Sequence, residues 1–546
     1  MPTINVERRE LEKAVGTKLP DEILNNRLPM LGMQLEKIDK ADLELEIFPN
    51  RPDMLSLQGL ARALRSYLGI KPGLVKYQAK KSNYHIYIDK NVTMRPYTAC
   101  AVVKNVRFTD ERIRDIMQIQ EKLAMTHGRN RRKSAYGLYP LNSINFPIRY
   151  VAKDPKTVMF QPLGSSKPIR ADKVGEQHKT GKLYAHIAKD WKLHPFFIDS
   201  KENVLCMLPY TNSEDTGKIA TQTRDVFIEC TGNNLENLQQ ALTILSTMLA
   251  DMGGAIHQVN LHYGNKKIIT PDLQPRKKKI SIDRVNKILG LQLNEKEVKN
   301  LLERMGYGYN KGTALVPAYR ADILHEDDIT EDIAIAYGFD NLDPILPEFA
   351  TVGKESDLEI FKRKVAEILA GLNMQEVLNY NIAPAETIKR SGFANNITVK
   401  DSRSEYTALR PSMLPGLLAT LGSNKHYAYP QRLFEIGSVF SQGTSETGVV
   451  EPAHLGIIIC QQDADFTKIK QIAQNLMQQL GLEGACKAAS HPSLIPGRTA
   501  QLTAQGKPVG TLGEVHPEFL SNFKIETPAA YLEVDVVALF NLARNA

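Results

Sequence analysis

The sequence predicts a multidomain α+β protein. With 546 residues the chain is too long for a single hydrophobic core, so we expect several domains that each bury their own. Stretches with the period of amphipathic helices, such as residues 234–252, occur along the chain together with short strand-like alternations, such as residues 43–48. The sequence shows no internal repeat and no low-complexity segment that would suggest a different architecture.

The composition is that of a water-soluble globular protein. Hydrophobic residues make up 42% of the chain and charged residues 24%, and the longest apolar runs, such as residues 455–460, are too short to cross a bilayer. The charged N-terminus does not resemble a targeting signal. The five cysteines are scattered, without a CxxC pair, which argues against a disulfide framework and a zinc site. We therefore expect a cytoplasmic protein.

The first domain is expected to span residues 1–90 as a small α+β unit. Its elements are a strand at 3–6, a helix at 8–15 and a strand at 43–48. Asn50 and Pro52 indicate a turn, after which Asp53 is expected to cap a helix over residues 54–68 that ends at Gly69. Turn and cap chemistry accounts for these residues, and we assign them no catalytic role.

Three further domains are expected, at residues 91–265, 270–346 and 350–546. The first of them is mixed and ends with the helix 234–252, which Gly253 and Gly254 stop. The second contains helices at 282–289 and 295–305, followed by an acidic helix. The last is predicted to be antiparallel α+β, with helices at 358–372 and 466–480 and strands near 377–380, 433–436, 455–460 and 531–536.

The acidic helix is a candidate metal site. Asp328, Glu331 and Asp332 follow one another at i, i+3 and i+4, so a helix places them on one face, with Asp322 just before it. Carboxylates this close repel one another, and Mg²⁺, which prefers oxygen ligands, would compensate them. From spacing alone a solvated polar face is the better interpretation, and both interpretations require the helix.

The net charge of +8 permits contact with nucleic acid without demonstrating it. Two basic runs, HGRNRRK at residues 127–133 and RKKK at Arg276–Lys279, could meet phosphates. Solvated loops also carry such runs. We favour the first, because it adjoins the candidate pocket described below.

Several motifs resemble one family. YRADILHEDDITEDIAIAYGFDNL resembles the signature of the B5 domain in the beta subunit of phenylalanyl-tRNA synthetase, and residues 28–70 resemble the opening domain of its archaeal and eukaryotic form. ALRPSMLPGLL with RLFEIG, and the stretch from His491 to Leu520, agree with the same family. The chain length is similar to that of the short archaeal type. The four domains are then B1-like (1–90), B3/B4-like editing (91–265), B5 (270–346) and class II synthetase-like (350–546).

The resemblance implies a ligase that charges tRNA(Phe) with phenylalanine and works as an α₂β₂ heterotetramer. ATP is a substrate bound mainly by the alpha subunit, which holds the aminoacylation centre, and Mg²⁺ is shared between the subunits. A working class II site needs arginines aimed at the ATP phosphates, because charge develops there. Arg432 is the only arginine beside RLFEIG, and the C-terminal stretch lacks a Gly-rich segment leading to an arginine. We therefore expect the last domain to be a catalytically inactive pairing platform.

The resemblance also implies an editing site that hydrolyses tyrosyl-tRNA(Phe), since an apolar pocket rejects an added hydroxyl poorly. Phe197 and Cys206 would line this pocket, Asn212 would orient groups near the ester, and Glu229 and Thr231 would bind the tyrosine hydroxyl. The basic residues Arg129, Arg131 and Lys133 would hold the tRNA end or polarise the ester. Water would be the nucleophile, and the metal ligands would be Asp322, Asp328, Glu331 and Asp332.

Three positions depart from the family pattern. We would expect a small hydroxyl at Cys206, a smaller aliphatic residue at Phe197 and an acidic residue near Pro140. Without the resemblance, Cys206 would be read as a buried core thiol, and Glu229 and Thr231 as strand-end hydrogen-bonding residues. The alternative is therefore a non-catalytic scaffold and tRNA-binding subunit with a degenerate editing site. A free-standing deacylase is a third and weaker alternative.

Overall fold

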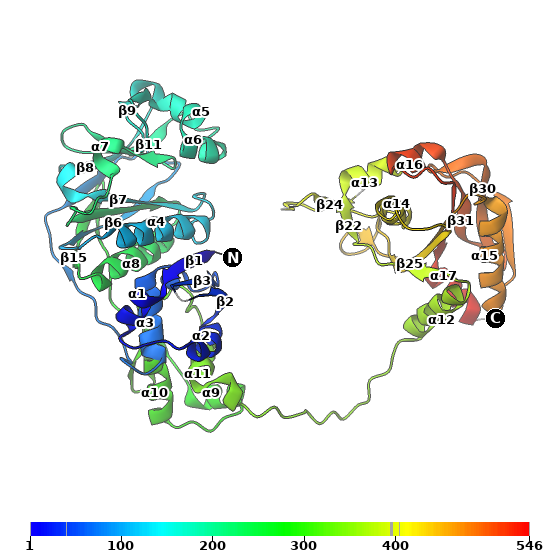
Figure 1. Cartoon of the computed structure of the whole chain (residues 1–546), viewed down its shortest axis with the longest axis horizontal. Helices are drawn as coiled ribbons and strands as arrows, with labels where there is room; N and C mark the ends of the chain where they lie inside the picture. Colours follow the sequence, from blue (N-terminus) through cyan, green and yellow to red (C-terminus); the bar gives the residue numbers. More distant parts are fainter. Residues whose placement is uncertain (1, 40, 394–396, 403, 545–546) are drawn as a thin grey trace. The chain divides into compact units, whose positions relative to one another are not determined.

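The computed structural model describes residues 2–39, 41–393, 397–402 and 404–544 and divides into two compact units, Met1–Ile345 and Leu346–Ala546 (Figure 1). Both units combine helices with sheets, which confirms the mixed, multidomain character expected from the sequence. Within the described residues, no helix is both long and apolar enough to span a membrane.

The N-terminal subdomain, residues 2–67, is a three-stranded antiparallel sheet of order β1-β3-β2 with helices against it. Its strands are β1 (Thr3–Glu7), β2 (Met33–Ile38) and β3 (Asp42–Ile47), and its helices are α1 (Arg8–Val15), α2 (Asp21–Arg27) and α3 (Leu57–Tyr67). The expected cap is wrong: Ser56, not Asp53, caps α3, because its Oγ accepts from the backbone of Gly59 at 3.1 Å. Asp53 lies in a 3₁₀ turn and pairs with Arg51 instead.

The two-sheet subdomain, residues 79–270, follows. Its larger sheet has the order β13-β12-β11-β8-β5-β16-β17 and its smaller sheet β4-β15-β6-β14-β7. The strands of the larger sheet are β5 (His85–Ile88), β8 (Ile148–Lys153), β11 (His194–Ile198), β12 (Val204–Met207), β13 (Thr211–Asn212), β16 (Val259–Tyr263) and β17 (Lys266–Thr270). Those of the smaller sheet are β4 (Ala79–Lys80), β6 (Tyr97–Lys104), β7 (Ser134–Pro140), β14 (Val226–Gly232) and β15 (Ala255–His257). Because β4 and β5 pair with later strands, these sheets begin before residue 91.

Each face of the smaller sheet is covered. Helices α4 (Asp110–Met125) and α8 (Leu235–Asp251) pack on one face, where α8 contacts β6 and β14. The other face meets the larger sheet in an apolar cluster that includes Cys100, Tyr139, Phe197 and Phe227. Phe197 and Cys206, two of the predicted editing residues, therefore lie between the two sheets. A two-stranded sheet, β9 (Met159–Phe160) with β10 (Ile169–Arg170), and the short helices α5 (Val174–Gln177), α6 (Lys179–Tyr184) and α7 (Glu214–Gly217) complete the subdomain.

The helical subdomain, residues 276–337, combines a three-stranded sheet of order β18-β20-β19 with three helices. The strands are β18 (Arg276–Lys279), β19 (Gly308–Asn310) and β20 (Thr313–Val316), and the helices are α9 (Ile282–Leu289), α10 (Glu295–Arg304) and α11 (Glu326–Tyr337). The basic run RKKK is thus a strand. Arg276 and Lys278 donate to backbone carbonyls between Arg320 and Leu324, which gives these two cations a structural role.

One apolar core runs through the N-terminal subdomain, the helix-covered face of the smaller sheet and the helical subdomain. It contains Ile4 and Leu60 from the first, Val103 from the second and Ile329 and Ile333 from the third, all fully buried. These subdomains therefore pack as one unit, which fixes the acidic helix α11 against the N-terminal subdomain.

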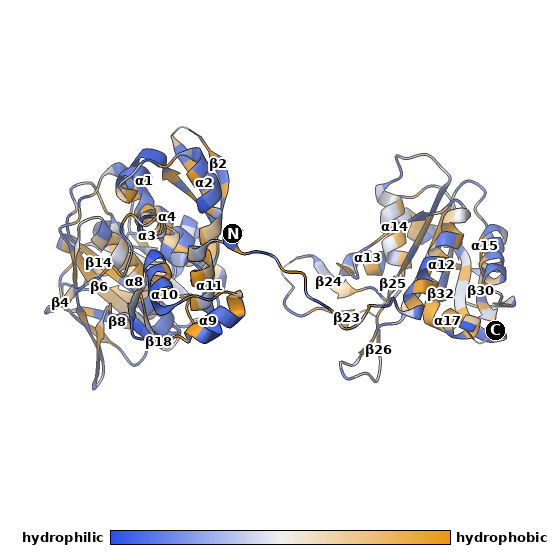
Figure 2. Ribbon diagram, turned by 90° about the horizontal axis from the view of Figure 1, so that it is seen from below, coloured by the Kyte–Doolittle hydropathy of each residue, from blue (hydrophilic) through white to orange (hydrophobic). Residues whose placement is uncertain are grey.

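The second unit is a seven-stranded sheet of order β21-β25-β28-β32-β31-β30-β29, antiparallel except for the β21–β25 pair. Its strands are β21 (Gln375–Glu376), β25 (Gln431–Ser438), β28 (Ala453–Cys460), β29 (Gly484–Ala488), β30 (Leu494–Ala504), β31 (Lys507–Val515) and β32 (Ala529–Asp535). Helices α12 (Asp357–Gly371), α15 (Phe466–Gln479) and α17 (Val536–Arg544) contribute to the core on one face and α14 (Leu414–Ser423) to the core on the other. In Figure 2 the ribbons of α12 and α15 carry both hydrophilic and hydrophobic residues, as expected for helices that bury one side.

Smaller elements complete this unit: β22 (Ile382–Pro384), β23 (Ile397–Thr398), β24 (Tyr406–Leu409), β26 (Ser441–Gln442), β27 (Val449–Val450), α13 (Ala385–Arg390) and α16 (Pro517–Asn522). A strand was expected near residues 377–380, but the structure has a shorter strand, β21, just before these residues. Leu378 and Tyr380 are exposed.

Candidate functional site

The four predicted metal ligands line one open pocket beside α11. Asp322, Asp328, Glu331 and Asp332 share it with residues of the N-terminal subdomain such as Arg51. Asp328 is the third residue of α11, and its carboxylate accepts from the backbone N–H groups of Leu324 and His325, each at 2.7 Å. These bonds form a capping box with His325, so Asp328 has a structural role in starting the helix.

Arg320 compensates two of the four carboxylates. Its Nη2 lies 2.7 Å from an oxygen of Asp322 and 2.7 Å from an oxygen of Asp332, and Tyr307 donates a further hydrogen bond to Asp332. Burial would raise the pKa of Asp322, but the Arg320 guanidinium holds it below its ordinary value. The repulsion that motivated the metal hypothesis is therefore relieved, for these two residues, within the chain.

Glu331 differs from the other three: it is exposed and has no hydrogen bond or ion pair among the described residues. Over the same part of the chain, no three His, Cys, Asp or Glu side chains are arranged to hold a metal ion. The fit to Mg²⁺ is therefore incomplete within this chain, because oxygen atoms from another molecule would have to complete the coordination.

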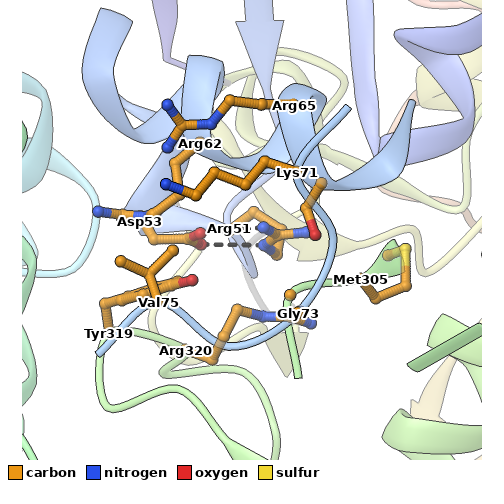
Figure 3. A pocket seen from close by; sticks show the side chains of 13 residues that line it. Arg51, Asp53, Arg62, Arg65, Lys71, Gly73, Val75, Met305, Tyr319 and Arg320 are labelled. Atoms are coloured by element: carbon orange, nitrogen blue, oxygen red, sulfur yellow. Dashed lines mark hydrogen bonds and ion pairs between the residues drawn. The ribbon is translucent and has the colours of Figure 1, made fainter. Parts of the chain in front are cut away.

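A second pocket is lined by both members of the Arg51–Asp53 pair (Figure 3). Arg51 donates to both oxygens of Asp53 at 2.9 Å, and Asp53 is only 1% exposed. Arg62 pairs with Asp251 at 2.6 Å and lies over the ring of Tyr319, 3.8 Å from its centroid. The ion pair with Asp251 joins the N-terminal subdomain to helix α8 of the two-sheet subdomain, whereas the contact with Tyr319 and the hydrogen bond from Ser66 to the carbonyl of Glu303 join it to the helical subdomain.

The five predicted editing residues that are not basic come together from four strands: Phe197, Cys206, Asn212, Glu229 and Thr231. In the larger sheet, Cys206 lies opposite Phe197 on one side and Asn212 on the other. In the smaller sheet, Glu229 lies opposite Gly137 and, across the other edge of its strand, Cys100. Phe197, Cys206 and Thr231 are fully buried and Glu229 is 1% exposed, so the cluster lies inside the protein.

Tyr139 links the two sheets at this point. Its hydroxyl lies 3.0 Å from Asn212 Oδ1 and 3.3 Å from Glu229 Oε1, and the thiol of Cys206 is adjacent. Sequence reasoning did not identify Tyr139. The signal was the alternation of β7, which places Tyr139 on the same face as Gly137, the partner of Glu229.

The cluster has two unsatisfied polar atoms. Oε2 of Glu229 and Oγ1 of Thr231 are buried and have no hydrogen-bond partner among the described residues. Burial raises the pKa of Glu229 to about 8, although the Arg95 guanidinium and the hydrogen bond from Tyr139 oppose the rise. Glu229 is therefore mainly protonated at pH 7, and a protonated carboxyl can donate as well as accept. A hydroxyl-bearing group would satisfy both atoms.

The predicted basic residues separate. Arg131 donates to the carbonyls of Pro209 and Tyr210 and lies 4.3 Å from the ring centroid of Tyr184, whereas Arg129 is exposed. Lys133 lines a different surface pocket, together with Asp322. The Arg95 guanidinium, which sequence reasoning missed, also acts on Glu229, and it donates to the carbonyls of Arg131 and Thr231.

One of the family departures fills the cluster. Phe197 stacks on Tyr150 with the ring centroids 4.6 Å apart, which occupies space that a smaller side chain would leave. Pro140 is buried at the end of β7, opposite Val226, whose side chain packs in the core on the helix-covered face of the sheet. Pro140 therefore lies on the face of β7 that points away from the cluster.

In the second unit, Arg410 is a further buried arginine that the sequence argument did not consider. It pairs with Glu435, which lies in the RLFEIG stretch, and it also donates to the carbonyl of Ser438. Arg432 itself has one long hydrogen bond to Gln461, at 3.4 Å. Because a carboxylate already neutralises Arg410, it is not positioned as a free cation for a phosphate.

Comparisons with known proteins agree over the whole chain. Residues 278–339 match the tRNA synthetase B5 domain, and residues 342–536 match the phenylalanyl tRNA synthetase beta chain CLM domain. The chain is 38% identical over 553 residues to the phenylalanine–tRNA ligase beta subunit of Archaeoglobus fulgidus, covering 99% of both chains. It is 36% identical to that of Pyrococcus horikoshii, covering 99% of this chain and 100% of the relative.

A solved structure supports the first unit. An N-terminal fragment of the phenylalanyl-tRNA synthetase beta subunit from Pyrococcus horikoshii superposes with a TM-score of 0.60 at 38% identity, covering 62% of this chain and 99% of the fragment. Full-length similarity and two matching domain models together show that the chain belongs to the family of phenylalanine–tRNA ligase beta subunits.

Proposed function

We propose that this chain joins a phenylalanine–tRNA ligase alpha subunit as an α₂β₂ heterotetramer that charges tRNA(Phe) with phenylalanine in the cytoplasm. The observation that carries the proposal is the match over 99% of both chains to relatives named as this subunit. ATP binds mainly to the alpha subunit. The second unit acts as a catalytically inactive, class II-like pairing platform, consistent with the neutralised Arg410.

Exposed apolar side chains on the second unit support a pairing role. Leu378 is 85% exposed and Tyr380 81% exposed, and the Tyr380 ring lies 6.0 Å, centroid to centroid, from that of Tyr406, which is also exposed. Clusters of exposed apolar residues commonly mark protein interfaces. Replacing Leu378 and Tyr380 together by serine should weaken binding of the alpha subunit, measured by size-exclusion chromatography with light scattering. Unchanged assembly would show that these residues lie outside the interface.

A second activity, hydrolysis of tyrosyl-tRNA(Phe), is favoured by the unsatisfied Glu229 Oε2 and Thr231 Oγ1. A tyrosine hydroxyl would pair with them, whereas a phenylalanine side chain would leave them desolvated, at a cost of about 1–3 kcal/mol for each group. Water attacks the ester carbonyl, and the products are tyrosine and a tRNA whose terminal hydroxyl is free. Arg129, exposed on its loop, is available for the tRNA backbone.

The test is hydrolysis of tyrosyl-tRNA(Phe) by the assembled complex, compared with Asn212→Ala and Glu229→Ala. We expect hydrolysis by the parent protein and a loss of at least about tenfold in each variant, because a group worth about 1.4 kcal/mol changes a rate tenfold. A rate no higher than that in buffer would favour the alternative, a non-catalytic scaffold that binds tRNA.

Magnesium is a further proposal. Asp328 and Glu331 would contribute carboxylate oxygens, with Asp322 and Asp332 nearby, and the alpha subunit would supply the remaining ligands; the ion would provide positive charge at the subunit boundary. Calorimetric titration of the assembled complex with Mg²⁺ should show weaker binding in Glu331→Gln. Asp340→Asn, which alters an exposed carboxylate just past α11, is the matched control. Equal binding by all three proteins would remove Glu331 from the site.

A further inference from the structure

Three of the residues assigned to the tyrosine pocket converge on a single atom, and that atom belongs to the chain itself. Asn212 Oδ1, Glu229 Oε1 and the Cys206 thiol surround the phenol hydroxyl of Tyr139. The resemblance implies that Cys206 lines a pocket for a tyrosyl ester, that Asn212 orients groups near the ester, and that Glu229 meets the tyrosine hydroxyl. Tyr139 carries the same ring and hydroxyl.

The backbone holds Tyr139 in this place. Gly137 lies two residues before it on the same face of β7 and opposite Glu229. A Cβ at position 137 would lie 2.6 Å from Glu229 Oε1 and 2.6 Å from the Tyr139 hydroxyl, so only glycine permits the two groups to meet here. The Tyr139 ring packs near Phe227, with the centroids 5.8 Å apart, and the residue is fully buried.

Resting on the proposed hydrolytic role of this cluster, we infer that Tyr139 is a specificity-determining residue whose phenol occupies the side-chain subsite of the ester. A tyrosyl ester enters only when Tyr139 withdraws. The exchange replaces one phenol by another: the substrate hydroxyl takes the place of the Tyr139 hydroxyl beside Glu229 and lies within reach of Thr231 Oγ1, which has no partner among the described residues. A phenylalanyl ester would make neither contact, because it lacks the hydroxyl.

The inference predicts that emptying the subsite accelerates hydrolysis. In complex with the alpha subunit, Tyr139→Ala should hydrolyse tyrosyl-tRNA(Phe) at least about tenfold faster than the parent protein, because the substrate no longer competes with an internal phenol. Hydrolysis of phenylalanyl-tRNA(Phe) should rise less. Tyr139→Phe, which keeps the ring in place, should stay within about threefold of the parent rate.

Two further variants make the test specific. Tyr139→Ala combined with Glu229→Ala should lose the gain, since the acceptor for the substrate hydroxyl is gone. Tyr67→Leu replaces a buried tyrosine in the N-terminal subdomain and should leave hydrolysis unchanged. Fluorescence of Trp191, the only tryptophan, reports folding of the two-sheet subdomain. Should Tyr139→Ala not fold, Tyr139→Leu retains apolar packing and carries the same expectation.

The outcomes separate the inference from the functions on which it rests. A Tyr139→Ala rate equal to or below the parent rate, or a tenfold loss in Tyr139→Phe, would overturn it, because the phenol would then assist the reaction. Absence of hydrolysis in every variant would overturn both the inference and the editing proposal. Normal charging of tRNA(Phe) with phenylalanine in those same preparations would leave the ligase role intact.

Discussion

Glu229→Gln tests the electrostatics of the buried cluster most sharply. The substitution preserves the shape of the side chain and an acceptor for Tyr139, and it removes the ionisable group. In the folded protein, burial raises the pKa of Glu229 from 4.5 to about 8. The folded state therefore binds the proton more tightly than the unfolded chain does. Stability from this group is present below pH 4.5 and is lost as the pH rises to about 8.

The magnitude follows from the linkage relation. Between pH 6.5 and pH 8 the parent protein should lose about 2 kcal/mol of unfolding free energy that Glu229→Gln retains. Below pH 6.5 a second buried group would add its own pH dependence, because burial lowers the pKa of His194 to about 4. The range from pH 6.5 to pH 8 avoids this contribution. That histidine has the opposite effect: stability gained through it rises with pH up to about 6.5 and is constant above.

Urea unfolding followed by the fluorescence of Trp191 provides the assay, because this tryptophan packs on the two-sheet subdomain. Glu331→Gln, at an exposed carboxylate, is the matched control and should show the pH dependence of the parent protein. The reasoning is refuted when Glu229→Gln and the parent lose the same free energy between pH 6.5 and pH 8, since Glu229 would then be ionised or solvated in the folded state.

Two further predictions concern packing and ion pairing. Arg320→Leu leaves Asp322 and Asp332 without their cation and should destabilise the first unit by about 3–5 kcal/mol. Arg284→Leu, which breaks an exposed ion pair, is the control and should cost less than about 1 kcal/mol. Similar melting temperatures of the two variants, measured by calorimetry, would contradict this prediction. Gly137→Ala forces the close contact described above and should cost about 1–3 kcal/mol in the Trp191 unfolding assay. Gly175→Ala, where the nearest atom to a new Cβ is 3.8 Å away, is the control, and equal effects of the two substitutions would show that the cluster has room.

Local sequence patterns predicted most helices well. The predicted helix at 282–289 has the observed bounds of α9, because Ser281 caps it and Gly290 ends it in the left-handed region. The helix expected at 54–68 begins later, since Asp53 is occupied by Arg51 and the hydroxyl of Ser56 is the available acceptor. Whether Asp53 caps the helix or pairs with Arg51 depends on how the turn folds, and hydrophobic periodicity carries no information on that.

In the candidate sites, too, local spacing predicted some features, whereas others depend on contacts between distant segments. The helical spacing predicted that Asp328, Glu331 and Asp332 share one face of a helix, and all three line one pocket beside α11. The compensation by Arg320 could have been anticipated, because this arginine lies two residues from Asp322. Tyr139 and Arg95 could not be found in the same way: they reach Glu229 through strand pairing between distant segments, and motif spacing carries no information on that pairing.

The central claim is that this subunit acts with an alpha subunit of phenylalanine–tRNA ligase. The most direct measurement mixes the purified chain with such an alpha subunit, determines the mass of the product by light scattering, and assays charging of tRNA(Phe) with radioactive phenylalanine and ATP. We expect an α₂β₂ assembly that charges tRNA(Phe), with neither subunit active alone. A chain that stays unassembled, with charging by the alpha subunit unaffected by its addition, would contradict the account.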